Sequence, residues 1–149
     1  MTNAPSQPDH RPAALTPIYW AVVAYTTLGL ASGLYYREFT KAHDFHGVTQ
    51  LAFVHTHLLA LGTLLGLILL LLERGFGLSR TAQWMPMWIT YNAGLVITAT
   101  MLTVKGTLQV LGSSSATSPA LAGIAGLGHI LLTLALVFLL VALKKRLPA

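Results

Sequence analysis

The longest apolar run in this chain extends from Thr49 to Leu72 and is long enough to cross a lipid bilayer. About 20 apolar residues span the hydrocarbon core as a helix. Within that core every backbone N–H and C=O must be paired by the protein itself, so a single apolar segment folds as a helix. This run therefore restricts the chain to the class of helical membrane proteins.

Three further apolar runs accompany it, and we expect transmembrane helices at about 17–36, 48–72, 84–104 and 120–143. The composition agrees, because 54% of the 149 residues are hydrophobic and 9% are charged, whereas soluble domains carry about 25% charged residues. Residues 1–16 are polar and rich in proline, which predicts a disordered tail. We predict an all-α polytopic membrane protein with one four-helix domain over residues 17–146.

The distribution of basic residues predicts the orientation of the chain. Four spans place both termini on one side of the membrane. That side would collect most of the Lys and Arg residues, which favours a cytoplasmic location for both termini. Basic residues that flank apolar spans report topology and contact with anionic lipid, so the net charge of +5 does not indicate nucleic-acid binding. The basic residues on the terminal side are Arg11, Arg74, Arg80, Lys144, Lys145 and Arg146, and those on the opposite side are Arg37, Lys41 and Lys105.

Three histidines lie well inside the expected spans: His55 and His57 in the second and His129 in the fourth. Ionisable residues inside a membrane helix are costly and indicate a functional site. Residues i and i+2 point about 200° apart on a helix, so His55 and His57 face nearly opposite directions. Counted from the expected helix starts, His57 and His129 lie at about the same depth, roughly 14 Å below the outer boundary. This shared level predicts a common function.

Haem b is the cofactor that these histidines favour, since imidazole is a common axial ligand of haem iron. We therefore predict that His55, His57 and His129 supply iron ligands, and consider copper the less favoured metal. Gly62 lies on the same face as His55 and would leave room beside a macrocycle, although close helix packing needs small residues as well. Arg37, Lys41 and Lys105 lie at the outer level, where the haem propionates would reach, and contact with lipid headgroups explains them equally well.

Two other functions remain open from the residues alone. The histidines could act as proton relays or transient ligands in a transporter or channel for protons, metal ions or a small solute. A structural role within a larger complex is the third reading. The chain contains no cysteine and only four acidic residues, so hydrolase and ATPase chemistry is not expected. Electron transfer, or binding of O2 or NO at an open axial position, is the redox chemistry that this inventory supports.

Several segments resemble a family of small bacterial four-helix membrane proteins of unknown function. The likeness is carried by YYREFTK (residues 35–41), FHGVTQLAFVHTHLLALG (45–62), YNAGL (91–95) and GIAGLGHI (123–130). It implies a multi-pass protein of the bacterial inner membrane. More distantly, HTHLLALG is similar to the HxH-bearing helix in the catalytic subunit of haem-copper oxidases and nitric oxide reductases. In that superfamily the two HxH histidines ligate two different haems within a pseudo-threefold ring of twelve helices.

The distant likeness implies that this chain is one third of such a ring. A homotrimer would then hold haem between His55 of one copy and His57 of the next, and would exchange electrons with a further partner. The histidines of the oxidase copper site have no counterpart in the third span, so the resemblance does not extend to copper. Pairing of His57 with His129 inside one protomer is the alternative.

Overall fold

The computed structural model describes residues 14–147 and has four long helices, in agreement with the predicted all-α membrane fold. Each of the four is long and apolar enough to cross a membrane, and the described residues form no strand. The second span is a continuous rod of three parts, with a π-helical segment between two α-helical ones. The elements are α1 (Leu15–Ala42), α2 (Leu51–His57), η1 (Leu58–Leu64, π-helical), α3 (Leu65–Phe76), η2 (Leu78–Arg80), α4 (Trp84–Val110), η3 (Ser114–Thr117) and α5 (Pro119–Arg146).

The helices α1 and α4 extend beyond the predicted spans at their C-terminal ends. Apolar content marks the part of a helix that lies in hydrocarbon, whereas the polar residues that follow still form hydrogen-bonded turns. α1 therefore continues through the charged YYREFTK segment to Ala42, and α4 continues to Val110. At the other end of α1, Leu15 and Thr16 are helical, although the sequence placed them in the tail. Residues 1–13 of that predicted tail lie outside the described residues.

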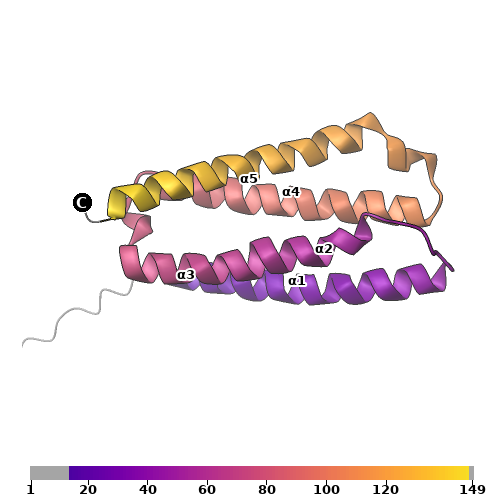
Figure 1. Cartoon of the computed structure of the whole chain (residues 1–149), viewed down its shortest axis with the longest axis horizontal. Coiled ribbons are helices and arrows are strands. Elements are labelled where there is room, and N and C mark those ends of the chain that lie inside the picture. The colour runs from indigo at the N-terminus through magenta and orange to yellow at the C-terminus, as the bar shows by residue number, and fades with distance from the viewer. Residues whose placement is uncertain (1–13, 148–149) are drawn as a thin grey trace, which may run out of the picture.

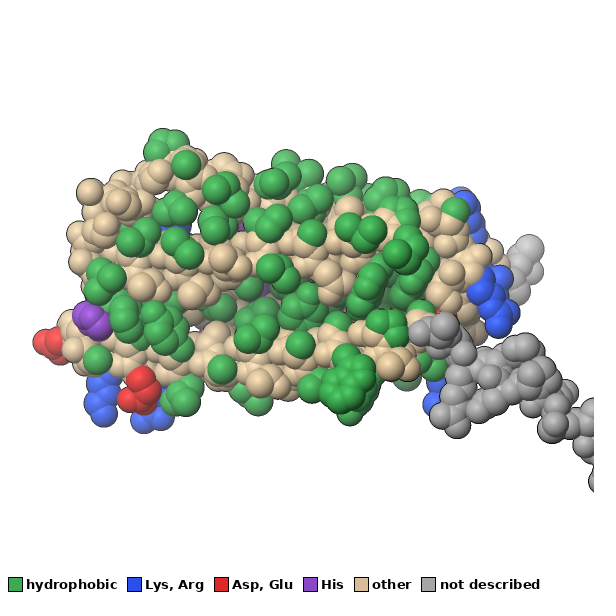
Figure 2. Space-filling model, turned by 180° about the vertical axis from the view of Figure 1, so that it is seen from behind, with side chains coloured by type: hydrophobic (Ala, Val, Ile, Leu, Met, Phe, Trp, Pro, Cys, Tyr) green, Lys and Arg blue, Asp and Glu red, His purple; other side chains and the backbone are tan. Residues whose placement is uncertain are grey.

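The bundle consists of two antiparallel helix pairs (Figure 1). α1 packs along the rod of α2, η1 and α3, while α5 packs along α4; contacts between α2 and α4 join the two pairs. The start of α1 and the end of α5 lie at the same end of the bundle. Hydrophobic side chains cover the middle of the surface and charged side chains gather towards its two ends (Figure 2), which is the distribution that a bilayer requires.

Glycines bring α1 and the second span close together. A Cβ at Gly29 would lie 2.8 Å from Leu59 Cδ2, and one at Gly66 would lie 2.5 Å from Val22 Cγ2. Larger residues at either position would have to push the two helices apart. Small residues at such positions allow the close backbone approach on which helix association in membranes depends.

The second span begins at Leu51, three residues later than the sequence predicted. Thr49 Oγ1 donates a 2.8 Å hydrogen bond to the Gly106 carbonyl, and the Gln50 backbone N–H donates one of 2.8 Å to Gln109 Oε1. These bonds attach the residues before the helix to α4. Because helix starts leave backbone N–H groups without intrahelical partners, the Gln109 side chain satisfies one group that the helix itself cannot.

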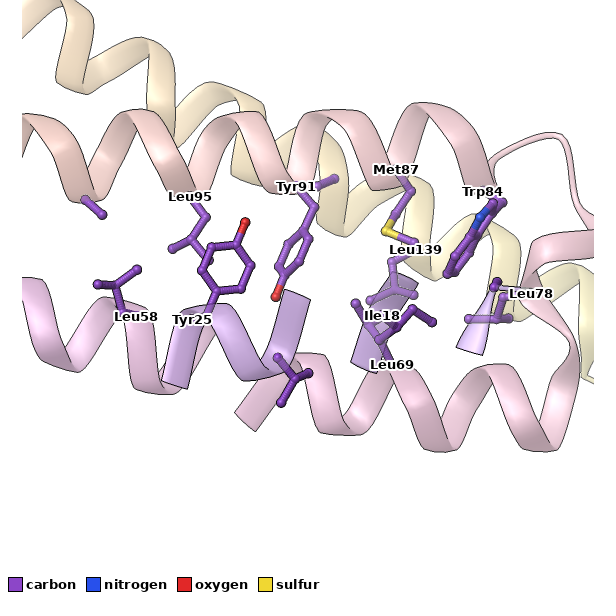
Figure 3. Packing of buried hydrophobic residues seen from close by; sticks show 14 of the residues in the cluster. Ile18, Tyr25, Leu58, Leu69, Leu78, Trp84, Met87, Tyr91, Leu95 and Leu139 are labelled. Atoms are coloured by element: carbon purple, nitrogen blue, oxygen red, sulfur yellow. The ribbon is translucent and has the colours of Figure 1, made fainter. Parts of the chain in front are cut away.

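The π-helical segment η1 starts directly after His57, where the sequence predicted an uninterrupted α-helix. The Tyr91 hydroxyl on α4 donates a hydrogen bond to the Leu61 carbonyl in this segment. Nearby, the Tyr25 hydroxyl on α1 donates a 2.7 Å hydrogen bond to Asn92 Oδ1. Both tyrosines lie in the buried core between the helix pairs (Figure 3). Single π-helical stretches within α-helices occur frequently at functional sites.

Candidate functional site

The imidazole rings of His57 and His129 face each other between the second and fourth spans. Their ring centroids lie 6.5 Å apart and the ring planes are inclined at 85°. His57 is the last residue of α2, and His129 lies in the first half of α5. The structure therefore brings together two of the three histidines that the sequence selected, and they belong to the same chain.

Both rings are held in the same way by their own helices. His57 Nδ1 lies 2.8 Å from the Phe53 carbonyl oxygen, and His129 Nδ1 lies 3.0 Å from the Ala125 carbonyl oxygen. A carbonyl oxygen only accepts, so each Nδ1 must carry the proton. In the neutral ring the lone pair then resides on Nε2. Within residues 14–147 no hydrogen bond to either Nε2 is found, so both lone pairs are available to a ligand.

The exposure of these rings argues for a bound group. His129 is exposed and His57 is partly exposed on the protein surface, at a level that the sequence predicts to lie inside the bilayer. A polar group that is removed from water without a hydrogen-bond partner costs several kcal/mol in apolar surroundings. A ligand bound by both rings would remove this cost, whereas contact with lipid would not.

The backbone of α4 fixes the position of His129. The preceding residue, Gly128, lies so close to α4 that a Cβ there would be 2.5 Å from Thr98 Oγ1. A Cβ at Gly94 would in turn lie 2.9 Å from the Gly128 carbonyl oxygen. Thr98 itself is 1% exposed, and its hydroxyl has no hydrogen-bond partner within the described chain. This close crossing holds α5 against α4 immediately beside His129.

The surface outward of His129 is open. A Cβ at Gly126 or Gly123 would meet nothing within 4 Å. Gly126 precedes His129 by three residues and so lies on nearly the same helix face. In the part of the chain that the structure covers, α5 packs along α4 and not closely along α2. There is accordingly free surface next to the two rings for a flat group.

His55 occupies a different environment. Its Cβ and Cγ would lie 3.7 and 3.8 Å from a Cβ at Gly33, so this side chain faces α1. His55 Nδ1 is buried and has no hydrogen-bond partner among residues 14–147. The opposite directions that the sequence predicted for the HxH pair are thus present in the structure. They direct His55 to α1 and His57 to α5.

Three other residues predicted for the site lie away from the His57–His129 pair. Gly62 lies under the ring of Tyr25 on α1, and this tyrosine fills the space that the sequence left open for a macrocycle. Arg37 and Lys41 are exposed near the outer end of α1, and Arg37 Nε lies 3.6 Å from Glu38 Oε1. Since α1 packs on the second span and α5 packs on α4, these residues do not converge on the two rings.

Sequence reasoning did not identify the part of α4 that positions His129. Gly94 and Thr98 form a small-xxx-small pattern, which allows close helix approach in membranes. That pattern could have indicated the contact with Gly128. No comparable signal pointed to Tyr91 as the partner of the π-helical segment.

The number of ligands limits the kind of metal group that fits. Within residues 14–147 no group of three or more His, Asp or Glu side chains converges on a point. A bare zinc ion takes three or four protein ligands, which this pair does not provide. A haem brings its own in-plane nitrogens and needs only axial ligands from the protein. The donor set therefore fits a haem better than a bare ion.

Comparison with known proteins assigns a family and no activity. Residues 15–146 match a family described as a protein of unknown function (DUF2871). No curated protein and no solved structure matches the chain. The chemistry of the site must therefore be inferred from its own residues.

Proposed function

The chain belongs to the DUF2871 family, whose function is unknown, and from its own geometry we propose that it is a membrane protein that binds b-type haem between His57 and His129. The observation that carries this proposal is the placement of the two rings. Each ring is hydrogen-bonded to its own helix through Nδ1, neither Nε2 has a hydrogen-bond partner among residues 14–147, and the ring centroids lie 6.5 Å apart.

His57 and His129 would be the residues that hold the haem, because their rings approach each other to 6.5 Å from the second and fourth spans. The hydrogen bonds from Nδ1 to Phe53 and Ala125 also support ligation, since metal-bound histidines usually donate their other N–H to a fixed acceptor. Such a bond sets the orientation of the ring and raises its basicity.

The protein residues define what the site can do. A bound haem would supply one-electron chemistry at its iron. If His57 and His129 both held it, the haem would favour electron transfer to a partner over binding of O2 or NO. Because each ring is held by its own helix and α5 is held against α4 at Gly128, the ligands are preorganised. Preorganised ligands favour electron transfer, which needs little change in geometry.

The trimer implied by the oxidase likeness stays a prediction. It is supported by the HTH residues alone, and it assigns His55 and His57 to haems at the interfaces between copies. The proposed site, in contrast, is complete within one protomer. An electron-transfer partner likewise remains a prediction of the proposal.

A proton or metal transporter is the principal rival. A transport path needs polar groups in line across the membrane. Glu73, the acidic residue in α3, instead accepts hydrogen bonds of 2.8 and 2.5 Å from the Ser79 N–H and hydroxyl at the turn after that helix. The Glu73 carboxylate is therefore hydrogen-bonded at the C-terminal end of α3, away from the histidines.

An absorption spectrum tests the proposal. The full chain is expressed with haem precursors supplied, purified in detergent, and assayed for haem by the pyridine haemochrome against protein mass. We expect one haem per protomer and a low-spin Soret band that shifts on reduction. A colourless protein that takes up no added haem contradicts the proposal and favours the transporter.

A further inference from the structure

We propose that Lys105 binds the carboxylates of the haem held by His57 and His129 and thereby orients it, with its polar edge towards the outer membrane surface. This inference rests on the proposed function. Among the three basic residues that the sequence places at the level of the propionates, Arg37, Lys41 and Lys105, it selects the one on α4.

Lys105 is a cation one residue beyond the predicted end of the third span at residue 104, in the part of α4 that continues past the apolar run. It is partly buried and lies five residues before the end of α4 at Val110. Among residues 14–147 no ion pair to its ammonium group is found. The acidic residues at the same end, Glu38 and Asp44, pair with Arg37 and His46 respectively. Because an opposite charge stabilises a partly buried ammonium group, Lys105 is able to bind an anion from outside the chain.

The helical register places Lys105 on the face of α4 that meets α5. Seven residues are close to two turns, so Lys105 lies on the same face as Thr98, about 10 Å further outward. Thr98 contacts Gly128, the neighbour of His129. Lys105 therefore lies outward of the two rings and along the same helix pair.

A haem in this position would present a suitable anion. Its two carboxylates share one edge of the macrocycle, and they are least costly to place near the polar boundary of the membrane. Lys105 is the basic residue of α4 on that side of the rings. Arg37 and Lys41 belong to α1, which is packed on the second span rather than beside α5.

The test compares haem with its dimethyl ester, in which both carboxylates are blocked. Full-length protein produced without haem is titrated with each compound in detergent, and binding is followed in the Soret region. We expect the wild type to bind haem about tenfold more tightly than the ester, which is the size of effect typical of one charge-assisted contact. Lys105→Met should bind both compounds alike, and Lys105→Arg should restore most of the preference.

Lys41→Met serves as the matched control, because it removes an exposed lysine at the same end of the bundle and should keep the wild-type preference. If Lys105→Met also keeps the preference, Lys105 contacts lipid headgroups and this inference is overturned. If the wild type binds haem and ester equally, with a spectrum that depends on His57, the haem site is supported and the contact of Lys105 with the haem carboxylates is contradicted. If the wild type binds neither compound, both proposals are contradicted.

Discussion

Thr98 on α4 occupies the space that a side chain at Gly128 on α5 would need. A Cβ at position 128 would lie 2.5 Å from Thr98 Oγ1 and 3.1 Å from the Thr98 backbone nitrogen. The distance between α4 and α5 is thereby set one residue before His129. Any change in this contact should alter the geometry of the His57–His129 pair, which makes it a sensitive point for experiment.

Gly128→Ala should weaken the α4–α5 contact, because the added methyl group collides with Thr98. Overpacking of this kind typically costs about 1–3 kcal/mol. We expect a lower free energy of unfolding in bicelles and, in the haem-loaded protein, an altered Soret band. Gly75→Ala, in α3 and away from the two rings, is the control, since a Cβ there meets nothing within 4 Å. Equal behaviour of the two variants would show that α5 does not depend on this crossing.

Substitution of the histidines should separate the intra-protomer pair from the oxidase-like arrangement. His57→Ala and His129→Ala each remove one axial ligand, so each should abolish the low-spin spectrum and reduce haem content. His55→Ala should retain that spectrum, because His55 faces α1. Visible absorption of the three purified variants provides the measurement. Loss of the spectrum in His55→Ala, with His129→Ala unaffected, would favour ligation across the interfaces of a trimer.

Tyr91→Phe should destabilise the protein without removing a haem ligand. The variant loses the hydrogen bond from the Tyr91 hydroxyl to the Leu61 carbonyl in the π-helical segment. Side-chain hydrogen bonds in membrane proteins contribute about 0.6 kcal/mol on average and up to about 1.7 kcal/mol. We expect a loss within this range in the unfolding free energy. Tyr19→Phe, at an exposed position, should behave like the wild type, and the same loss in both variants would argue against the Tyr91 contact.

The orientation of the chain can be tested directly, because the sequence contains no cysteine. Asp44→Cys introduces a single exposed thiol between the first two spans, and Ala82→Cys introduces one between α3 and α4. With cytoplasmic termini, a membrane-impermeant maleimide should label the first variant in intact cells. It should label the second only after the membrane is permeabilised. The reverse pattern would place the termini outside.

The sequence predicted the four apolar spans well and their ends less well. The length of an apolar run follows from the thickness of the hydrocarbon, but a helix ends where its backbone loses partners. α1 thus continues six residues beyond the predicted end at residue 36, to Ala42, because its polar turns remain hydrogen bonded. The second span starts late because Thr49 and Gln50 bind α4 instead of helical neighbours. No local signal reveals such a contact.

The sequence by itself determined that this chain has four helices long and apolar enough to cross a membrane, with three histidines in two of them. Hydrocarbon thickness and the rise of a helix do not depend on the sequence, so the position of a residue within an apolar run gives its depth in the bilayer. Only the tertiary structure decided which histidines meet. The two side chains of an HxH pair point in nearly opposite directions, and the neighbour that each one faces depends on how the helices pack. That packing places α5 and His129 opposite His57, and α1 with Gly33 opposite His55.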